Sequence, residues 1–427
     1  MTEKEPIGVL GAGWVGLVTA ACFAELGHRV VARDIVAGKV EQLQRGEVPI
    51  HEPGLPELIE RNHDRLAFTT EVGDVLDTAR LLFVCVDTPP TASGDADLSS
   101  VRGVVADVSD GGNHVMVMKS TVPAGTGTTI RRELDSLPYV SCPEFLKEGT
   151  AVDDFLHPER VVIGAEPEDE PAADAVQDVY APLDGEVVRT DVTSAEMIKL
   201  ASNAFLAAKI SFINEIANVC EDLGADVNAV AKGMGLDERI GPRFLRAGIG
   251  WGGSCFSKDV SALKQLAANT GYHFQLLNAV IEVNELQKRR VINKLKDQLG
   301  SLAGKRVALL GLAFKPDTDD MRGASSLVMA ARLQGEGATV IGYDPVASER
   351  AREVLPGVEM AASAMEALDG ADAAILVTEW AEFEELDWSG AAKRMAQPLL
   401  IDGRNFLDAD ALRAVGFTYD GIGRNSA

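Results

Sequence analysis

The sequence predicts an α/β fold, with two Rossmann-like, doubly wound domains joined by a central helical region that contains one long helix. Short apolar runs alternate with helix-like stretches over residues 1–192, which is typical of a parallel sheet covered by helices. A helical pattern fills residues 193–299, and the strand-helix alternation restarts over residues 300–427. A chain of 427 residues is long enough for two or three domains. We therefore place domain boundaries at residues 192 and 299.

The elements follow from the same pattern, taken in chain order. Strands are expected at residues 7–10, 29–32, 81–86 and 115–119, where short apolar runs occur. The long helix is expected to begin at Thr193 or Ser194 and to end before Gly224, and a second helical segment covers residues 260–299. In the last domain, the runs RVALLGLAF from 306, ATVIGYDP from 338, AAILVTEW from 373 and PLLIDGRN from 398 predict buried strands that end in polar residues.

Composition excludes several classes of function. A net charge of -25 and a pI near 4.6 argue against a nucleic-acid or anionic-membrane surface. Five scattered cysteines without a C-x-x-C pair indicate a reducing compartment, and we expect a cytoplasmic protein. Six histidines without tight His/Cys spacing predict no metal site. Residues 7–24 carry no charge, but their glycines at 8, 11, 13 and 16 predict a buried strand and a tight turn instead of a membrane span.

The first strand runs into Gly11-Ala-Gly13-Trp-Val-Gly16, a G-x-G-x-x-G that opens an apolar helix pattern. With Asp34 at the end of the next strand, this context is the fingerprint of dinucleotide binding. Gly11 is expected to make the tight turn, Gly13 to admit a pyrophosphate, and Gly16 to allow close helix packing. Asp34 is expected to hold the adenosine ribose, which favours NAD over NADP, while Arg33 beside it weakens that preference.

A second motif, GWGGSCFSKD at residues 250–259, surrounds Cys255 with glycines on one side and with Lys258 and Asp259 on the other. Glycines permit backbone conformations that are closed to other residues and let a ligand come close. A neighbouring cation favours the reactive thiolate. A single cysteine is often inert packing, so the glycine framing is what favours a nucleophile here.

Ordered sequence blocks of this kind cover nearly the whole chain. They are GAGWVGL at 11–17, RGEVPIHEPGL at 45–55, VDTPP at 86–90, KSTVPAGT at 119–126, CPEFLKEG at 142–149, EMIKLASNAF at 196–205, GWGGSCFSKD at 250–259, LGLAFKPDTDDMR at 310–322 and IDGRN at 401–405. Together they resemble the UDP-glucose/GDP-mannose dehydrogenase family, and most closely its branch that acts on UDP-glucose. The resemblance implies an NAD-binding first domain, a central dimerisation domain and a last domain that binds the UDP-sugar.

The resemblance also implies a reaction: oxidation of UDP-glucose to UDP-glucuronate with two NAD per turnover. Cys255 matches the family nucleophile, which adds to the aldehyde intermediate to form a thiohemiacetal and, after the second oxidation, a thioester. Glu144 is expected to be the base for thioester hydrolysis. Asp259 and Thr121 are expected to hold a catalytic water during alcohol oxidation, and Glu148 matches a further acidic position near them.

Lys199 and Asn203 lie four residues apart in the expected long helix, so their side chains share one face. They match the family's pair that stabilises the developing alkoxide and oxyanion. A lysine four residues from an asparagine is more often on a solvated face. A buried face is favoured here by the apolar neighbours, which are Ile198, Leu200, Phe205 and Leu206.

The other expected contacts follow from motif position within the family. The cofactor set adds Trp14, Val15, Lys39, Thr88, Lys258 and Arg322 to the turn glycines, Asp34, Thr121 and Glu148. The substrate set adds Phe145, Leu146, Lys147, Phe244, Arg246, Gly252, Phe314, Lys315 and Arg404 to Cys255, Glu144, Glu148, Lys199 and Asn203. Arg239 matches an arginine that reaches the substrate of a partner subunit, which implies a homodimer.

The sequence departs from the family pattern in four places. Ser257 stands where many relatives have proline, and Cys142 stands where serine or asparagine is usual. Val36 replaces a second acidic residue after Asp34, and Arg33 replaces a small or apolar residue. The first two departures concern loop rigidity, and the last two concern the choice between NAD and NADP.

Two alternatives stay open at this stage. The same chemistry could act on GDP-mannose or a UDP-N-acetylhexosamine, although the segment PEFLKEGTAVDDFLHPERVVIG is more similar to the UDP-glucose branch. In a different class, the chain could be a catalytically silent NAD-binding regulator. The intact set of Cys255, Lys199, Asn203, Glu144 and Asp259 argues against that alternative.

Overall fold

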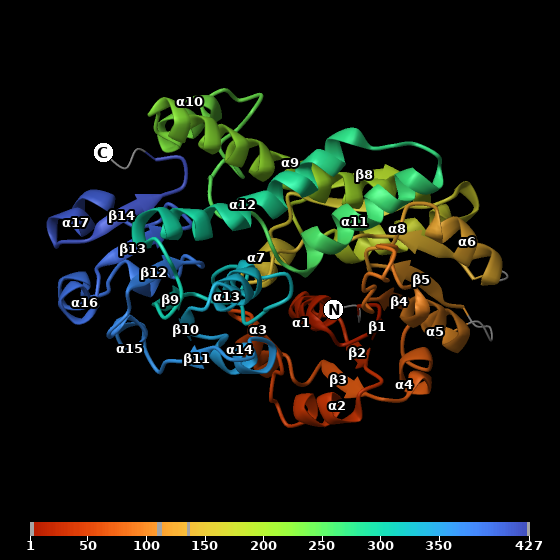
Figure 1. Ribbon diagram of the computed structural model, residues 1–427. Helices are drawn as coiled ribbons and strands as arrows, with labels where there is room; N and C mark the ends of the chain where they lie inside the picture. Colours follow the sequence, from red (N-terminus) through yellow and green to blue (C-terminus); the bar gives the residue numbers. More distant parts are fainter. Residues whose placement is uncertain (1–3, 109–112, 135–136, 425–427) are drawn as a thin grey trace. The chain divides into compact units, whose positions relative to one another are not determined.

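The computed structural model describes residues 4–108, 113–134 and 137–424 (Figure 1). The chain divides into two compact units: unit 1 comprises Met1–Ser202 and Ser261–Tyr272, and unit 2 comprises Asn203–Val260 and His273–Ala427. Helices α9 (Val192–Leu223) and α11 (Ser254–Asn269) each contribute residues to both units. The division into three domains at residues 192 and 299 stays a prediction.

The described part of unit 1 contains an eight-stranded sheet in the order β3-β2-β1-β4-β5-β6-β7-β8. Neighbouring strands are parallel except for β6 and β7, which are antiparallel. The strands are β1 (Ile7–Leu10), β2 (Val30–Arg33), β3 (Leu66–Thr69), β4 (Leu81–Val84), β5 (Val115–Met118), β6 (Tyr139–Ser141), β7 (Arg160–Gly164) and β8 (Glu186–Thr190). All four expected strands are present, and the second begins one residue later than expected.

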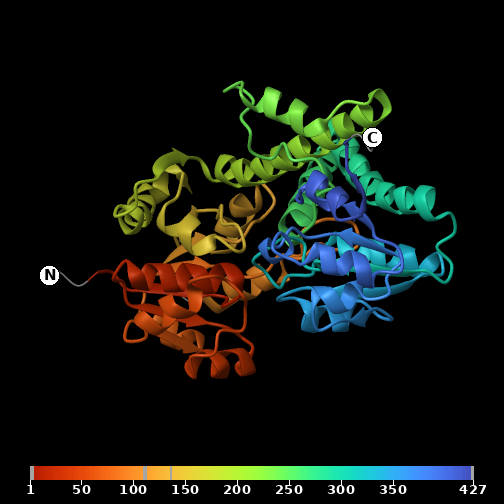
Figure 2. The same ribbon diagram turned by 90° about the vertical axis from the view of Figure 1, so that its left-hand side faces the viewer.

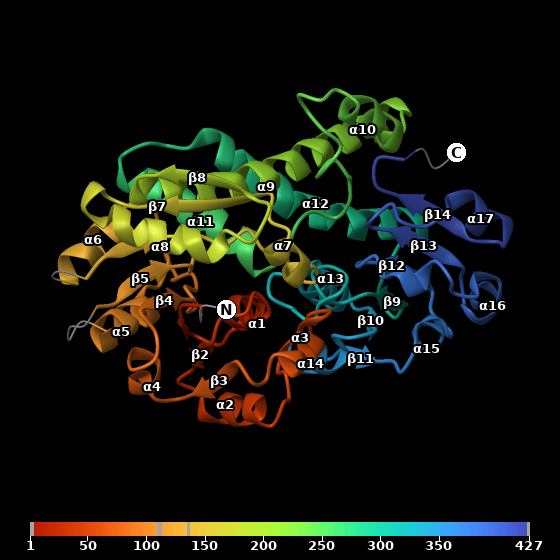
Figure 3. The same cartoon turned by 180° about the vertical axis from the view of Figure 1, so that it is seen from behind.

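Both faces of this sheet are covered, because its strands are apolar on both sides. Ile7 and Val9 join one core cluster with α1 (Trp14–Glu25), α2 (Ala37–Gln44), α3 (Leu55–Arg61), α7 (Ala151–Leu156) and α8 (Glu170–Tyr180). Leu10 and Val31 join another with α4 (Val72–Leu76), α5 (Ser99–Val108) and α6 (Thr126–Glu133). Figure 3 shows β7 and β8 with α8 beside them. A short 3-10 helix, η1 (Pro167–Asp169), precedes α8.

The uncharged segment at residues 7–24 is the buried strand β1 followed by a turn and helix α1, as expected from its glycines. The middle of α1 is fully enclosed, since each residue from Gly16 to Ala24 is buried. Among the described residues, no helix combines the length and the apolar character that crossing a membrane would require.

The described part of unit 2 contains a six-stranded parallel sheet in the order β11-β10-β9-β12-β13-β14, drawn in blue tones in Figure 1. Its strands are β9 (Arg306–Leu310), β10 (Thr339–Tyr343), β11 (Glu359–Met360), β12 (Ala373–Leu376), β13 (Leu399–Asp402) and β14 (Thr418–Gly421). One face packs on α9, α12 (Gln275–Leu299), α13 (Ser325–Gly335) and α14 (Ser348–Val354). The other packs on α15 (Ala364–Leu368), η2 (Ala381–Phe383), α16 (Trp388–Arg394) and α17 (Ala409–Ala414). The predicted pair of doubly wound sheets is therefore confirmed.

The helical region differs from the expectation in its details. The long helix α9 is uninterrupted, as Figure 2 shows in yellow and green, and it begins within two residues of the expected start. The segment expected at residues 260–299 is two helices, because the chain turns at Gly271, whose φ is 82°. Helix α10 (Val227–Gly235) was not expected; Asp226 caps it by accepting the N–H of Asn228.

Candidate functional site

The turn after β1 in unit 1 has the geometry that a dinucleotide requires. Gly11 has a φ of 102°, and a Cβ at Gly16 would lie 1.8 Å from the Gly11 carbonyl oxygen. Gly13, in contrast, has no atom within 4 Å of the place where a Cβ would be. Helix α1 begins at the next residue, Trp14, so its N-terminal N–H groups face this open position. These three glycines therefore fit a bound pyrophosphate at the helix N-terminus.

Asp34 follows β2 and is 7% exposed. Its Oδ2 accepts the N–H of Ala12 at 3.0 Å and the ammonium of Lys39 at 2.8 Å. Asp34, which directly follows β2, thus fixes the backbone of the glycine turn. The sequence expectation grouped Asp34 and Lys39 as cofactor residues, and the structure brings both to the same edge of the sheet.

Arg33 is held by groups other than Asp34. Its guanidinium donates to Asp107 at 2.8 Å and to the carbonyl oxygen of Thr70 at 3.1 Å. An arginine that recognises a 2′-phosphate needs its fork of N–H groups for the phosphate oxygens. In this structure that fork is directed at Asp107 and at the Thr70 carbonyl oxygen.

Lys199 and Glu144 form a buried ion pair in unit 1. The Lys199 Nζ lies 2.7 Å from the Glu144 Oε1, and each side chain is 5% exposed. The N–H of Leu146 donates to the Glu144 Oε2 at 2.6 Å. Nearby, the hydroxyl of Thr88 donates to the carbonyl oxygen of Thr121 at 2.8 Å. Both pairs join residues that were expected from separate sequence motifs.

The pKa of Glu144 is set by opposing effects. Burial raises it, whereas the charge and hydrogen bond of Lys199, the Leu146 N–H and the more distant charge of Lys119 lower it. The lowering effects win, and the pKa of Glu144 lies below its ordinary value. Glu144 is therefore an ionised carboxylate held in a buried place, which is the form that a general base needs.

Cys255 lies in unit 2 in the first turn of helix α11 and is partly exposed. Of the three glycines before it, Gly250 and Gly253 have positive φ angles, 95° and 88°, which other residues rarely adopt. A Cβ at Gly253 would lie 2.7 Å from the ring of Phe314, and one at Gly250 would lie 2.4 Å from the Asn284 side chain. The glycine framing thus brings the chain tightly against its surroundings and places the thiol at a helix N-terminus, where a thiolate is favoured.

A polar cluster lies on α9 and α11 within unit 2. Asn203 Nδ2 donates to Asp259 Oδ2 at 2.6 Å, and Lys258 Nζ contacts Asp259 Oδ1 at 2.6 Å. Asn203 is 7% exposed and Asp259 1%. Burial of Lys199 and Asn203 agrees with the expectation for this helix face, but Phe205, one of the apolar residues behind that expectation, is 68% exposed.

The expected substrate residues of unit 2 have different environments. Arg404 donates from Nε to the carbonyl oxygen of Val377 at 2.7 Å and from an NH group to that of Gly250 at 2.9 Å, which ties it to the glycine-rich segment. A Cβ at Gly252 would lie 2.3 Å from the carbonyl oxygen of Gly323, so the glycine-rich segment packs tightly against the backbone at Gly323.

The remaining expected residues lie at more open positions. Arg322 pairs with Asp320 at 2.9 Å and has a side chain that is 61% exposed. Arg246 is exposed and contacts the carbonyl oxygen of Asn405 at 3.4 Å. The remaining members are Val15, Phe145, Leu146, Phe244, Phe314 and Lys315, which are half-buried, and Lys147, which is exposed. Glu148 is the exception, because it is buried. Arg239 is 88% exposed and pairs with Asp237 in its own turn.

Sequence reasoning missed two buried carboxylates. Glu52 lies in the block RGEVPIHEPGL and binds Trp14 and two backbone N–H groups, and Asp344 lies after β10 and binds the turn after β9. A signal for Asp344 was present, because it ends the strand after the glycine turn, as Asp34 does. No comparable spacing rule points to Glu52.

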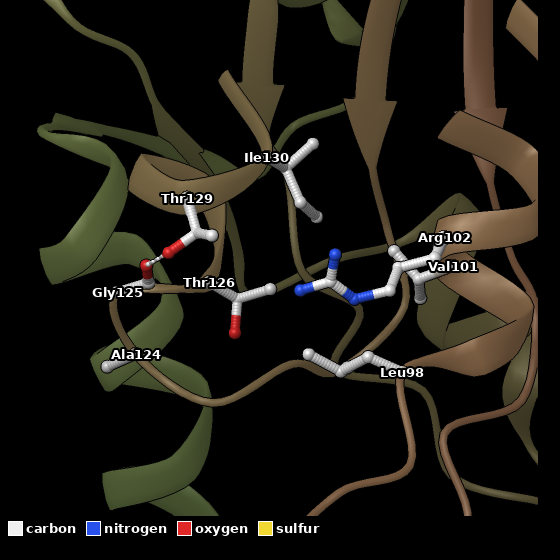
Figure 4. A pocket seen from close by; sticks show the side chains of 8 residues that line it. All are labelled: Leu98, Val101, Arg102, Ala124, Gly125, Thr126, Thr129 and Ile130. Carbon is white, nitrogen blue, oxygen red and sulfur yellow. Dashed lines mark hydrogen bonds between the residues drawn. The ribbon is translucent and has the colours of Figure 1, made fainter. Parts of the chain in front are cut away.

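A small cavity of about 210 Å³ lies between α5 and α6 (Figure 4). Its lining residues are Leu98, Val101, Arg102, Ala124, Gly125, Thr126, Thr129 and Ile130. None of these is an expected site residue. Arg102, whose guanidinium points across the cavity in Figure 4, pairs with Glu133 at 2.8 Å. This cavity therefore does not coincide with the candidate site.

Comparison with known families matches three consecutive models, all of the UDP-glucose/GDP-mannose dehydrogenase family. The NAD binding domain matches residues 5–184, the central domain residues 193–286 and the UDP binding domain residues 308–409. The first match covers β1 to β7, the third covers β10 to β13 and most of β9, and the second contains Lys199, Asn203 and Cys255.

Individual relatives agree with this result. The chain is 44% identical to the UDP-glucose 6-dehydrogenase TuaD of Bacillus subtilis over 98% of its own length and 93% of that protein. A UDP-glucose dehydrogenase structure from Pyrobaculum islandicum matches with a TM-score of 0.92 at 38% identity, covering 99% of this chain and 98% of that one. A UDP-D-ManNAc dehydrogenase structure from Pyrococcus horikoshii matches with a TM-score of 0.87 at 27% identity, covering 99% and 100%.

Proposed function

The chain belongs to the UDP-glucose/GDP-mannose dehydrogenase family, and we propose that it is a UDP-glucose 6-dehydrogenase, which oxidises UDP-glucose to UDP-glucuronate with NAD. The observation that carries this proposal is Cys255, partly exposed in the first turn of α11 and framed by Gly250 and Gly253. Oxidation of an alcohol to a carboxylate passes through an aldehyde, and a thiolate is the group that holds such an intermediate covalently.

NAD would be held by the turn of Gly11, Gly13 and Gly16 and by Asp34, and it supplies the hydride acceptor for each oxidation. Helix α1 offers its N-terminal N–H groups to the pyrophosphate. The engagement of Arg33 by Asp107 supports the non-phosphorylated cofactor.

Unit 2 supplies the covalent step in this proposal. The Cys255 thiolate forms a carbon-sulfur bond with the aldehyde carbon, and the aldehyde oxygen becomes the oxygen of a thiohemiacetal. Loss of hydride from that carbon leaves a thioester, and attack by water releases the carboxylate and returns the thiol. Asp259 holds Asn203 at 2.6 Å, so the amide is oriented to donate to an oxygen anion or to water.

Unit 1 supplies the buried base. Glu144 is kept ionised by Lys199, and we assign it the proton of the water that hydrolyses the thioester. Lys199, whose ammonium pairs with Glu144, is assigned to a developing oxygen anion on the strength of its motif position. Glu148 and Thr121 are assigned to water and cofactor positioning on the strength of their motif positions.

We further propose a homodimer built on α9. Phe205, Phe212 and Val219 recur every seven residues along this helix and are 68%, 51% and 51% exposed. Such an apolar stripe on a long helix is typical of a helix-helix interface. The exposed Arg239 pairs with Asp237 in its own turn and is assigned to the substrate of the partner subunit.

We also propose a cytoplasmic location. The five cysteines all lie in the described part of the chain, and none of them forms a disulfide. Thiols that stay unlinked are typical of a reducing compartment.

The same chemistry on another sugar nucleotide is the second candidate, since a UDP-D-ManNAc dehydrogenase shares the fold at 27% identity. The higher identities to enzymes named for UDP-glucose, 44% and 38%, support UDP-glucose instead. The glucosyl pocket is therefore proposed from relatedness, and substrate comparison is the test that separates the two.

The test measures NADH formation with UDP-glucose, UDP-N-acetylglucosamine, UDP-N-acetylmannosamine and GDP-mannose in parallel, for the wild type and Cys255→Ala. We expect about two NADH per UDP-glucose and a loss of turnover in the variant of about 10⁴-fold or more, since removal of a covalent nucleophile has effects of this size. Turnover with a different sugar nucleotide would keep the thiol chemistry and replace the substrate. A protein that binds NAD but oxidises none of the four sugar nucleotides would refute the proposed enzymatic function. That result would support the alternative of a catalytically silent NAD-binding regulator.

A further inference from the structure

Glu52 is a buried carboxylate that joins two distant segments of unit 1. It is 2% exposed and lies in the loop before α3. Its Oε2 accepts the indole N–H of Trp14 at 3.0 Å and the backbone N–H of Gly149 at 2.7 Å. Its Oε1 accepts the backbone N–H of Ala151 at 2.8 Å. Both carboxylate oxygens are therefore used, and they reach two places that are far apart in the sequence.

Each of these places belongs to the proposed machinery. Trp14 is the first residue of α1, directly after the glycines of the dinucleotide turn. Gly149 directly follows Glu148, and Ala151 is the first residue of α7. Gly149 has a φ of 83°, so the chain turns sharply at the residue after Glu148. The Thr150 side chain does not cap α7, and Glu52 accepts the N–H of Ala151, one of the N–H groups in the first turn that lack a partner within the helix.

The chemistry of this contact requires a carboxylate. All three groups that point at Glu52 are N–H donors, so an acceptor with two oxygens satisfies them and an amide cannot. Hydrogen bonds to an ionised acceptor are shorter and about twice as strong as neutral ones. A buried charge is costly unless it is bound in this way, which ties the conformation of both segments to the same side chain.

We propose that Glu52 is a positioning residue that couples the NAD-binding turn to the Glu144 to Glu148 segment, so that the cofactor site and the acidic segment keep one fixed geometry. This inference rests on the proposed function, because the roles of Trp14 and Glu148 in turnover are part of that proposal. Glu52 is assigned no contact with substrate or cofactor and acts through Trp14 and through the turn at Gly149.

The central experiment compares Glu52→Gln with Trp14→Phe in the full-length protein. Glu52→Gln turns an amide group toward at least one N–H donor and disturbs both segments. We expect its NAD dissociation constant to rise and its kcat to fall, each about tenfold or more, as for the loss of a buried charged hydrogen bond. Trp14→Phe removes the indole donor alone. We expect its NAD dissociation constant to rise several-fold and its kcat to fall less than in Glu52→Gln.

A spectroscopic readout separates positioning from general stability. The chain has 4 tryptophans, so ¹⁵N-tryptophan labelling gives few indole N–H resonances, and the one missing in Trp14→Phe identifies Trp14. We expect this resonance to move in Glu52→Gln while the other indole resonances stay in place. The matched control is Glu47→Gln, which removes an exposed carboxylate of the same loop that pairs with Arg45. This control is expected to keep the NAD dissociation constant and kcat within about twofold.

The coupling is overturned if Glu52→Gln changes thermal stability alone, or changes only one of the two constants. If Glu52→Gln does not fold, Trp14→Phe decides, and an unchanged NAD dissociation constant in that variant overturns the proposal. A wild type that oxidises no sugar nucleotide would refute the proposed function instead. In that case the NAD dissociation constants and the Trp14 resonance still test whether Glu52 fixes the dinucleotide turn.

Discussion

The turn after β1 in unit 1 and the turn after β9 in unit 2 begin in the same way. Gly11 and Gly311 have φ angles of 102° and 82°. A Cβ on Gly11 would lie 2.7 Å from the carbonyl oxygen of Cys85, and one on Gly311 would lie 2.4 Å from Thr378. Cys85 follows β4, which pairs with β1, and Thr378 follows β12, which pairs with β9. Both turns therefore require glycine for the same two reasons.

An aspartate after the second strand then holds each turn. Asp34 accepts the N–H of Ala12, and Asp344 accepts the N–H groups of Leu312 and Ala313 at 2.6 and 3.0 Å. The other partners of the two carboxylates differ. Asp34 also binds the ammonium of Lys39, whereas Asp344 binds further N–H groups from within unit 2 and is 2% exposed.

The largest difference between the turns lies in the segments that connect them to the next helix. Helix α1 begins at Trp14, and Gly13 leaves open space beside its N-terminus. Helix α13 begins only at Ser325, and the longer loop before it carries Phe314 against Gly253. The shared turn therefore does not by itself bind a dinucleotide. The helix N-terminus must be brought to the turn, and in unit 2 the same turn serves to place a loop beside the glycine-rich segment instead.

Alanine substitutions of the turn glycines should break the comparison most strongly. In Gly16→Ala the Cβ would meet a backbone oxygen at 1.8 Å, so we expect a loss of about 3 kcal/mol in the free energy of unfolding and a rise of about 100-fold in the NAD dissociation constant. Gly311→Ala should lose a similar free energy because of its positive φ, yet keep the NAD dissociation constant within about twofold. Chemical denaturation and NAD titration measure both quantities.

The control for these variants is Gly38→Ala, since a Cβ at this position in α2 meets nothing within 4 Å. It should gain about 0.5–1 kcal/mol from helix propensity and leave NAD binding unchanged. Equal losses of NAD binding in Gly16→Ala and Gly311→Ala would contradict the division of roles between the two turns.

The two aspartates should sharpen the comparison. Asp344→Asn turns an amide toward N–H donors in a buried place, and we expect a loss of about 3 kcal/mol in the free energy of unfolding. Asp34→Asn keeps a solvent-accessible partner in Lys39, which is half-buried, and should lose about 1 kcal/mol. Asp34→Asn should raise the NAD dissociation constant about tenfold, whereas Asp344→Asn in the folded protein should leave this constant unchanged. Larger destabilisation by Asp34→Asn would show that the two carboxylates are not arranged as described.

Much of this architecture was readable from the sequence. The strand at residues 7–10, the glycine turn and the start of the long helix follow from apolar runs and glycine spacing, because these signals are local. The break at Gly271 and the capped helix α10 were missed, although Gly271 and the cap residue Asp226 are local signals of the kind that end and begin helices.

The site was predictable to the extent that its residues lie in compact motifs. Asp34 follows from a spacing rule, and Cys255 follows from its glycine framing. Asp344 could have been found by the same rule as Asp34, because it ends the strand that follows a glycine turn. Glu52 escaped because its partners are the Trp14 indole and two backbone N–H groups contributed by other parts of the fold. Such partners come close only after the chain has folded, so no sequence pattern predicts the contact.

Glu144 offers a further contrast, because it depends on a cation where the turn aspartates depend mainly on backbone donors. Its lowered pKa means that the ionised form is favoured by folding. The wild type therefore has this stabilisation above the ordinary carboxyl pKa of about 4.3 and loses it as the pH falls through the lowered value. In Lys199→Met, burial should dominate and raise the pKa of Glu144. That variant should then gain about 1–2 kcal/mol as the pH falls from neutrality toward 5.

Denaturation of both proteins across this pH range gives the sign directly. The double variant Glu144→Gln with Lys199→Met should show neither trend. A Lys199→Met protein that loses stability on acidification in the same way as the wild type would mean that Lys199 does not control the charge of Glu144.

Among the five cysteines, Cys255 is partly exposed and the other four are buried. Burial raises the pKa of Cys85 to about 12 and also raises that of Cys142, both in unit 1. Both buried thiols therefore stay protonated at pH 8, and their alkylation should be negligible. Cys255, partly exposed at the start of α11, should react first with iodoacetamide, to about one equivalent. Peptide mass spectrometry identifies the site, and Cys255→Ser should resist the reagent. Early modification of Cys142 would instead mean that the core of unit 1 opens readily, and that its departure from the family pattern exposes a reactive thiol.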